Sequence, residues 1–175
     1  VNSWKYVEGP IKTYNLWEVE DSHTFFANGL LAHNKTCFTA GAKITMADGS
    51  KKNIEDVEIG EELLGQDGKV NKVLRFERPV LKQLDRRYVI SFNDMDRPYV
   101  MSEHPFLVKT EVPLKGQVTQ WKSTQPDITK EIYPGFATWD IGMLGVGDVI
   151  VTEDGEDYKI EKINNYPEAN PETQL

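Results

Sequence analysis

The sequence has little of what several large classes of protein need. It contains one cysteine, Cys37, so no disulfide can form within the chain and cysteine usage does not reveal the redox compartment. Acidic residues outnumber basic ones, 28 to 20, and the net charge of -8 gives no basic face for nucleic acid. Neither a signal peptide nor an apolar run of about 18 residues is present. We therefore expect a soluble chain without a nucleic-acid partner or a membrane segment.

What is present is an ordinary globular composition. Of the 175 residues, 39% are hydrophobic and 27% are charged, which is far from the composition of a disordered chain. A chain of this length suits a single domain with its own core. Because the sequence begins at Val1, we interpret it as a piece of a longer polypeptide, and its cellular location stays unknown.

Short strands separated by turns predict an all-β fold. Tyr14 to Val19 alternates apolar and polar residues, Phe25 to Ala27 is a second strand, and Asn28-Gly29 between apolar runs is a strong hairpin signal. Further strands are expected at residues 4–7, 43–46, 62–64, 70–76, 88–92, 99–101, 106–109, 148–152 and 158–163.

Two segments lack this pattern. Residues 116–136 are polar and contain Pro126 and Pro134, so we expect a long irregular loop there. The tail at residues 164–171 is expected to be extended and exposed.

Two motif-bearing stretches nearly touch in the sequence. The first runs from Tyr14-Asn15-Leu16 to His33-Asn34, and the second runs from Cys37 through a small-residue turn and a strand to Glu61. The second resembles the first motif of inteins and related hedgehog/intein (Hint) self-processing domains, and the first resembles the last two motifs of that family. The order is therefore reversed, with the closing motifs before the opening one.

The resemblance implies a fold and a division of the chain. We expect an all-β Hint fold, a flat horseshoe of short strands, formed by residues 1–175 as a single domain. Residues 1–34 would be the C-terminal intein motifs, residues 35–36 a junction dipeptide, and residues 37–175 the N-terminal intein motifs with the remaining strands. Homing-endonuclease insertions, which some inteins carry, have no room in a chain of this length.

The resemblance also assigns roles at the first junction. Cys37 would attack the carbonyl of Thr36 in an N–S acyl shift, because a thiolate is a good nucleophile for acyl transfer. His104, in the sequence Ser102 to Phe106, matches the histidine of the second family motif and would polarise and protonate the scissile amide. A histidine suits this role because its pKa lies near neutrality.

At the second junction the resemblance implies cyclisation of Asn34. Its side-chain nitrogen would attack its own backbone carbonyl, release Lys35 and leave a succinimide. The preceding His33 would donate a hydrogen bond to the oxygen or the leaving amine. His23 matches the histidine of the penultimate motif and would assist this step. All three histidines of the chain thus fall at motif positions.

Departures from the family pattern leave a second reading open. The family often has threonine where this chain has Ala42. It usually has threonine three residues before the histidine of the second motif, where this chain has Met101. Ser102 could supply the hydroxyl in place of this threonine, or the hydrogen bond that the threonine hydroxyl makes is missing. The alternative function is therefore an inactive Hint scaffold that serves as a structural or binding module, or an unrelated β-sandwich.

No cofactor or metal is expected. Cysteine and histidine are legitimate zinc ligands, yet Cys37 and the three histidines have neither C-x-x-C nor H-E-x-x-H spacing, so a metal would be an inhibitor and not a cofactor. Splicing also needs a cysteine, serine or threonine after the terminal asparagine, and that residue is Lys35. Cleavage without ligation is the expectation. The partners are the flanking segments of the chain's own precursor, and the cytoplasm suits the processing step.

The reversed order allows two topologies. Residues 4–8 resemble residues 158–162, and aligning Thr13 with Thr173 gives a period of 160 residues (173 minus 13). The chain is then either a window across two tandem domains or a circular permutation. The short linker keeps the Cα atoms of Asn34 and Cys37 within roughly 11 Å of each other. We expect a monomer closed on itself, with a domain-swapped dimer as the alternative.

Overall fold

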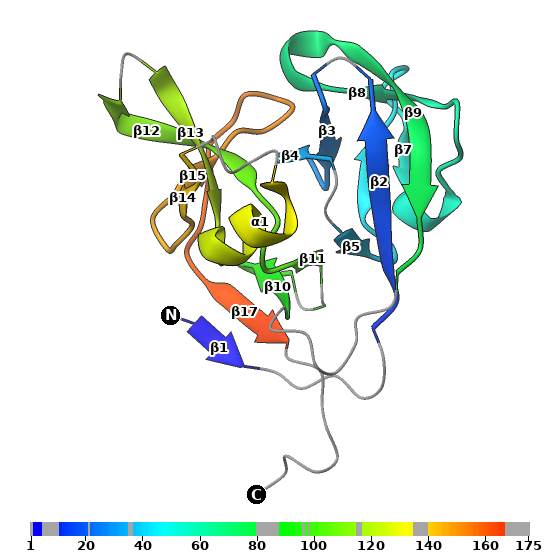
Figure 1. Cartoon of the computed structure of the whole chain (residues 1–175). Coiled ribbons are helices and arrows are strands. Elements are labelled where there is room, and N and C mark those ends of the chain that lie inside the picture. The colour runs from blue at the N-terminus through cyan, green and yellow to red at the C-terminus, as the bar shows by residue number, and fades with distance from the viewer. Residues whose placement is uncertain are drawn as a thin grey trace, which may run out of the picture.

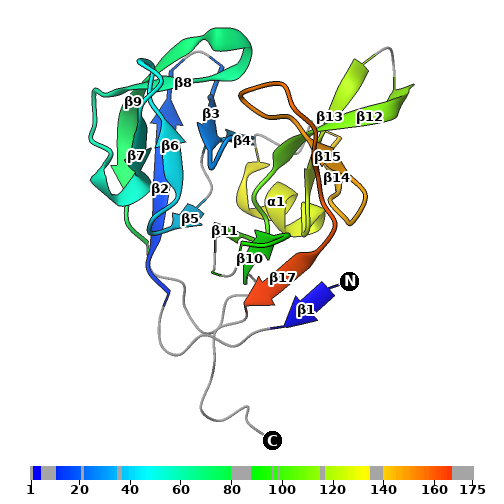
Figure 2. The same ribbon diagram turned by 180° about the vertical axis from the view of Figure 1, so that it is seen from behind.

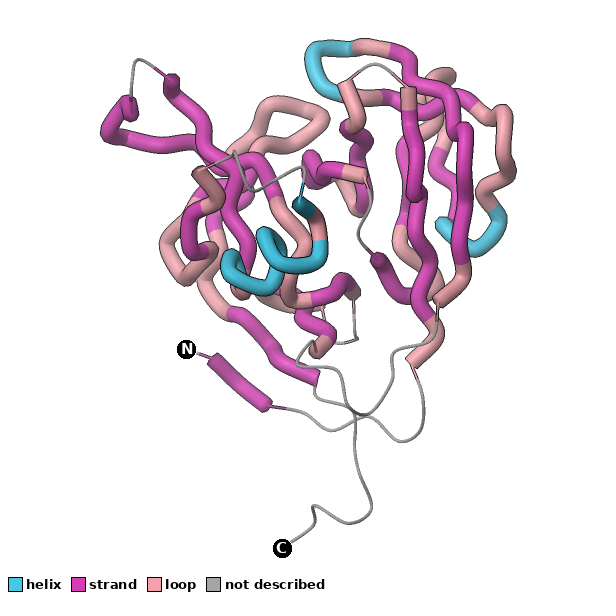
Figure 3. Tube along the Cα trace, viewed as in Figure 1, coloured by secondary structure: helices cyan, strands magenta, loops and turns pink. Residues whose placement is uncertain are grey.

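The structure is a computed structural model, and it describes residues 2–4, 11–20, 22–34, 37–79, 88–95, 97, 99–114, 117–134 and 140–166. Strands dominate the described part of the chain (Figure 3), which confirms the predicted all-β fold. Figures 1 and 2 show two groups of strands, one around β12 and β13 and one around β2 and β9, with the β3–β4 hairpin between them.

One sheet crosses the base of the molecule and rises into the second group (Figure 1). Within the described residues it has eight strands, and most neighbours in it run antiparallel; β1 and β17 are parallel. In spatial order the strands are β1 (Asn2–Trp4), β17 (Ile163–Tyr166), β10 (Val89–Phe92), β11 (Val100–Met101), β5 (Cys37–Thr39), β2 (Thr13–Val19), β9 (Val70–Glu77) and β8 (Glu62–Leu64).

The other sheet joins the two groups through the central hairpin. Its order is β14 (Gly142–Met143), β13 (Gln117–Ser123), β12 (Phe106–Leu114), β4 (Leu30–His33), β3 (Thr24–Ala27), β6 (Lys43–Thr45) and β7 (Lys51–Asn53). β15 (Val149–Ile150) pairs with β12 and with β16 (Tyr158–Lys159). The helices of the described residues are α1 (Pro126–Ile132) and the 3-10 turns η1 (Ile54–Asp56) and η2 (Gln66–Gly68).

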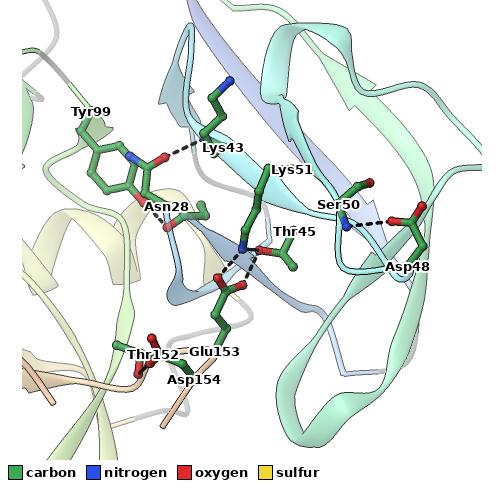
Figure 4. Close-up of polar contacts among 11 residues, drawn as sticks. Asn28, Lys43, Thr45, Asp48, Ser50, Lys51, Tyr99, Thr152, Glu153 and Asp154 are labelled. Carbon is green, nitrogen blue, oxygen red and sulfur yellow. Dashed lines mark hydrogen bonds and ion pairs between the residues drawn. The ribbon is translucent and has the colours of Figure 1, made fainter. Parts of the chain in front are cut away.

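The Asn28-Gly29 hairpin forms as predicted. Ala27 pairs with Leu30 across the turn, and Asn28 and Gly29 have φ values of 49° and 78°. Positive φ at both central residues matches the twist of the flanking strands, which is why Asn-Gly is favoured there. The backbone N–H of Lys43 donates to Asn28 Oδ1 (2.7 Å), as Figure 4 shows.

A second contact fixes the same turn. The backbone N–H of Glu153 donates to the carbonyl of Gly29 (3.0 Å). The Glu153 carboxylate in turn accepts hydrogen bonds from Thr45 Oγ1 (2.5 Å) and from Lys51 Nζ (Figure 4). The far end of the hairpin is therefore tied to β6, to β7 and to the loop after β15.

The early segment of the chain is built into both sheets. β2 lies between β5 and β9 and pairs antiparallel with each, while β4 pairs with β12 through Ala32 and Phe106. The main core is shared in the same way, since Leu16 and Phe25 lie in one buried cluster with Phe38 and Phe106. Strands before residue 34 thus complete a core that strands after residue 37 begin.

Most predicted strands form, with adjusted ends. The expected strand at 148–152 is reduced to β15, and the one expected at 158–163 is interrupted, so that β16 and β17 are separate elements. Strands β5, β7 and β14 had no predicted counterpart, and β5 replaces the beginning of the small-residue turn expected after Cys37. The expectation of an exposed tail from residue 164 was wrong for its first three residues, because Asn164, Asn165 and Tyr166 are buried in β17. The predictions for residues 5–7, for the Lys35-Thr36 dipeptide and for the tail beyond residue 166 lie outside the described residues.

The expectation of an irregular loop at 116–136 was wrong. β13 occupies residues 117–123 and pairs with β12, and α1 follows at residues 126–132. Pro126 begins the helix, a position where its missing N–H costs nothing. No helix in the described part of the chain has the length and apolar character that crossing a membrane requires.

Candidate functional site

The β3–β4 hairpin brings the two motif histidines of the early segment together. Thr24, which follows His23, pairs with His33 across the hairpin, and the two imidazole centroids are 6.1 Å apart. The backbone N–H of Asn34 donates to the carbonyl of His23 (2.8 Å). The predicted residues of the asparagine step therefore share one end of one hairpin.

His33 interacts directly with the carbonyl that Nδ2 of Asn34 would attack in the asparagine step. Its Nδ1 lies 3.1 Å from the backbone oxygen of Asn34. A carbonyl oxygen only accepts, so Nδ1 carries the proton and donates it. His33 is buried, and its ring packs edge-on against Trp121 of β13 at a centroid distance of 5.5 Å. The bond polarises the Asn34 carbonyl and would stabilise charge developing on its oxygen.

Asn34 is fully buried, and its amide is not used for structure. Its side chain is 0% exposed, and among the described residues neither Nδ2 nor Oδ1 has a hydrogen-bond partner. A buried polar group left unsatisfied costs about 1–3 kcal/mol, so such groups are rare unless they have another role. An amide without a fixed partner has no hydrogen bond to break before it reacts.

His23 is the exposed member of the group. It has a φ of 55°, in the left-handed region that few residues other than glycine adopt. Its Nδ1 lies 2.8 Å from the carbonyl of Val19, so Nδ1 donates and Nε2 is the acceptor nitrogen of the neutral ring. The bond at Nδ1 fixes the ring on one side and sets its tautomer.

His104 lies in an apolar surrounding close to this group. It is fully buried, with the ring of Phe38 at 4.4 Å and that of Phe106 at 5.0 Å. Burial lowers the pKa of His104 well below its usual range, and the nearby charge of His33 lowers it further. The imidazole is thus neutral at pH 7 and able to exchange one proton.

Cys37 begins β5, with its side chain in a small buried cluster. The cluster consists of Ile11, Cys37, Val89, Met101 and Tyr166. β5 pairs with β11 through Phe38 and Val100, which sets Met101 beside Cys37. Met101, the position where the family usually has threonine, therefore contributes an apolar side chain next to the thiol.

Comparison with known proteins identifies the family. The sequence model described as Hom_end-associated Hint matches residues 37–129, more than half of the chain, and the match begins at Cys37. This chain is a Hint domain. Membership supports self-processing of the intein type in general.

The chain is also similar to part of a curated protein. The catalytic subunit of the V-type proton ATPase of Candida tropicalis is 32% identical to the Hint domain over 104 residues, which are 55% of this chain and 10% of that protein. The chain thus spans about a tenth of the length of that relative. No solved structure matches the chain significantly.

The motif comparison gave no role to Asn15, which the structure places next to Cys37. It stands directly opposite Cys37 in the β2–β5 pair, is buried, and has no hydrogen-bond partner for Oδ1 among the described residues. Directly opposed residues of an antiparallel pair have Cβ atoms about 4.5–5.5 Å apart, so the Asn15 side chain lies close to the Cys37 side chain. Polar Asn15 at an inward position of an alternating strand was a usable signal.

The hydroxyl of Ser102 is engaged elsewhere. Ser102 Oγ accepts a hydrogen bond from the backbone N–H of Tyr88 (3.2 Å) and donates one to Gln125 Oε1. It therefore supports the turn before His104, and neither of these bonds replaces the family's threonine at the scissile amide. Ala42, the other departure, is buried in the main core.

A metal centre is not formed by the motif residues. Within the described ranges, no group of three or more His, Cys, Asp and Glu side chains is arranged to hold a metal ion. The site consists instead of a thiol, three imidazoles and a buried asparagine amide.

Proposed function

We propose that this Hint domain cleaves its own chain at the two bonds that flank the Lys35-Thr36 dipeptide. The observation that carries the proposal is the state of Asn34. It is a fully buried asparagine whose amide has no partner among the described residues and whose carbonyl accepts a hydrogen bond from His33 Nδ1 (3.1 Å). This arrangement suits cyclisation and has no evident structural purpose.

In the asparagine step, Nδ2 of Asn34 attacks the carbonyl carbon of the same residue. The new C–N bond closes a succinimide, the bond to Lys35 breaks, and the proton lost by Nδ2 reaches the leaving amine. His33 stabilises the oxyanion through Nδ1. His23 is expected to take part in the proton transfer through Nε2, its acceptor nitrogen.

In the thiol step, the sulfur of Cys37 attacks the carbonyl carbon of Thr36. A C–S bond forms, the peptide C–N bond breaks, and the α-amine of Cys37 takes up the proton, leaving a thioester. That proton comes from the Cys37 thiol, and neutral His104 relays it to the nitrogen and is neutral again at the end of the step. Hydrolysis of the thioester by water then completes the cut.

Ligation is not part of the proposal. For ligation, the acyl group of the thioester would have to pass to a thiol or hydroxyl of the residue after Asn34, and Lys35 has neither. The cuts would release the dipeptide and divide the chain into residues 1–34 and 37–175. We propose that both parts belong to one circularly permuted domain, because β2 and β4 pair with strands that follow Cys37.

The rival proposal is an inactive scaffold with the same fold. Met101 beside Cys37 favours it, because the usual threonine hydroxyl is missing there. The intact mass of purified protein, recorded at intervals with and without hydroxylamine, separates the two proposals. An active domain gives fragments that end at Asn34 and begin at Cys37. A mass that stays that of the whole chain under both conditions supports the scaffold.

A further inference from the structure

The turn that carries His104 is fixed from a segment that follows it in the chain. Ser102, Glu103 and His104 are all fully buried, and the backbone N–H of His104 donates to the carbonyl of Met101 (3.0 Å). The remaining carbonyls of this turn accept hydrogen bonds from side chains between residues 123 and 129. Apolar packing around the imidazole is not directional, whereas these hydrogen bonds are.

The central contact comes from the middle of α1. Thr129 is fully buried, and its Oγ1 donates to the carbonyl of Glu103 (2.7 Å), the residue before His104. Ser123 Oγ lies 2.7 Å from Thr129 Oγ1. Thr129 Oγ1 also lies 3.1 Å from the carbonyl of Gln125, and the shorter distance favours Glu103 as the acceptor. Because the Thr129 proton goes to a carbonyl in either case, Ser123 is the donor to Thr129. A chain of two hydroxyls therefore ends on the backbone that presents the imidazole.

Two further contacts hold the same turn one residue earlier. Thr124 Oγ1 donates to the carbonyl of Ser102 (2.6 Å). Ser102 Oγ itself donates to Gln125 Oε1. The carbonyl of Ser102 is thus fixed by Thr124, between β13 and α1, and the carbonyl of Glu103 by Thr129, within α1.

We propose that Thr129 is a positioning residue for His104 in the thiol step at Thr36-Cys37. Its hydroxyl fixes the Glu103 carbonyl and so sets the position and orientation of the His104 imidazole relative to the scissile amide. The inference rests on the proposed function, because it assigns Thr129 to one of the two cuts. A misplacement of about 1 Å at a reacting group can cost roughly 100-fold in rate.

Paired substitutions of Thr129 test this. Thr129→Val keeps the shape and removes the hydroxyl, and Thr129→Ser keeps the hydroxyl. In the full chain we expect Thr129→Val to slow hydroxylamine cleavage before Cys37 by roughly 10- to 100-fold and Thr129→Ser to stay near the wild-type rate. Scission after Asn34 should change less in both variants. Ser123→Ala, which removes only the donor to Thr129, should slow the first cut in the same direction if Thr129→Val does not fold.

Thr45→Val is the matched control. Thr45 is also buried, and its hydroxyl also donates a short hydrogen bond, to Glu153, but it lies on β6 beside the turn of the central hairpin. A loss of folding stability without a loss of cleavage rate is expected there. Equal slowing by Thr45→Val and Thr129→Val, or equal slowing by Thr129→Ser, overturns the positioning role.

A second readout does not depend on cleavage. NMR titration of the imidazole protons of His104 and His33 reports whether the buried ring keeps its surroundings. Thr129→Val should move the His104 signal and its titration toward those of a solvated histidine, while Thr129→Ser and Thr45→Val should not. If the wild type does not cleave, the proposed function fails and this titration still decides the role of Thr129. An unchanged His104 titration in Thr129→Val overturns it.

Discussion

At the residue scale, Asn34 and Cys37 are expected to act in separable steps. Asn34→Ala should abolish scission after residue 34, because alanine has no side-chain nitrogen to cyclise, and should leave hydroxylamine cleavage before Cys37 in place. Cys37→Ala should give the reverse pattern. Intact-mass measurement of both variants checks this. A C-terminal fragment that still begins at Lys35 in Asn34→Ala would rule out asparagine cyclisation.

The buried imidazole of His104 predicts a pH dependence of stability. Burial, and then the charge of His33, hold the pKa of His104 in the folded chain well below the ordinary value of 6.5. Below that value the unfolded chain binds a proton at His104 and the folded chain does not. The stability from neutral His104 is therefore present above about pH 6.5 and is lost as the pH falls below it, by at most about 1.4 kcal/mol per pH unit.

Urea unfolding of wild type and His104→Gln between about pH 7 and pH 5 measures this contribution. The free energy of unfolding of the wild type should fall more steeply toward acid. Both proteins have the same carboxylates, so a difference in slope belongs to position 104. Equal slopes would show that His104 takes up its proton as readily in the folded chain as in the unfolded one.

At the element scale, β9 supports the turn that contains His23. Asn71 is fully buried, and its Nδ2 donates to Ser22 Oγ (2.9 Å) and to the carbonyl of Thr24 (2.8 Å). These two residues flank His23, whose left-handed φ of 55° needs support from its neighbours. The position of His23 therefore depends on a strand that follows Cys37.

We expect Asn71→Ala to slow scission after Asn34 and to spare hydroxylamine cleavage before Cys37. It leaves the Ser22 hydroxyl and the Thr24 carbonyl without their donor, at a cost of about 1–3 kcal/mol of folding stability. Asn93→Ala is the control, because Asn93 also braces a loop, through a bond from Nδ2 to the carbonyl of Lys159 (2.9 Å), outside the site. Similar cleavage rates in the two variants would count against a role for Asn71.

The elements differed in how far the sequence could predict them. The Asn28-Gly29 turn was predictable because its residues themselves favour the positive φ values that the hairpin needs. The apolar residues Leu30 to Ala32 are a second local signal, because they carry the chain into the core where His33 and Asn34 are buried. In both cases the signal lies within a few residues of the feature that it predicts.

β13 and α1 gave no such local signal. β13 shows no alternation of buried and exposed residues, with Val118 66% exposed and Trp121 half-buried. α1 has seven residues, fewer than two full turns, and Gln125 before it makes no side-chain cap. These elements are formed by contacts with distant parts of the chain, such as the bond from Thr129 to Glu103. Asn15 is an intermediate case: a polar residue at an inward position of β2 was a local signal, but its position opposite Cys37 depends on strand register, which the sequence alone does not give.

At the scale of the whole molecule, the closing strands are expected to complete the same chain and not a neighbour. The short junction holds the Cα atoms of Asn34 and Cys37 within roughly 11 Å, so the tethered segment competes at an effective concentration of about mM. Light scattering at micromolar concentration should give a monomer of 20.0 kDa. A stable species of twice that mass would indicate exchange of residues 1–34 between two copies.

The last expectation concerns the chain after both cuts. Residues 11–34 place Leu16, Val19, Phe25 and Leu30 in the main core, together with side chains from beyond residue 37. Burying such side chains contributes about 1.5–3 kcal/mol each, and β2 and β4 add backbone hydrogen bonds to β5, β9 and β12. The fragments 1–34 and 37–175 should therefore stay bound and elute together from a native gel-filtration column. In urea, which weakens apolar burial, they should separate. Native separation of the two fragments would show that the strands before Asn34 are not an integral part of this core.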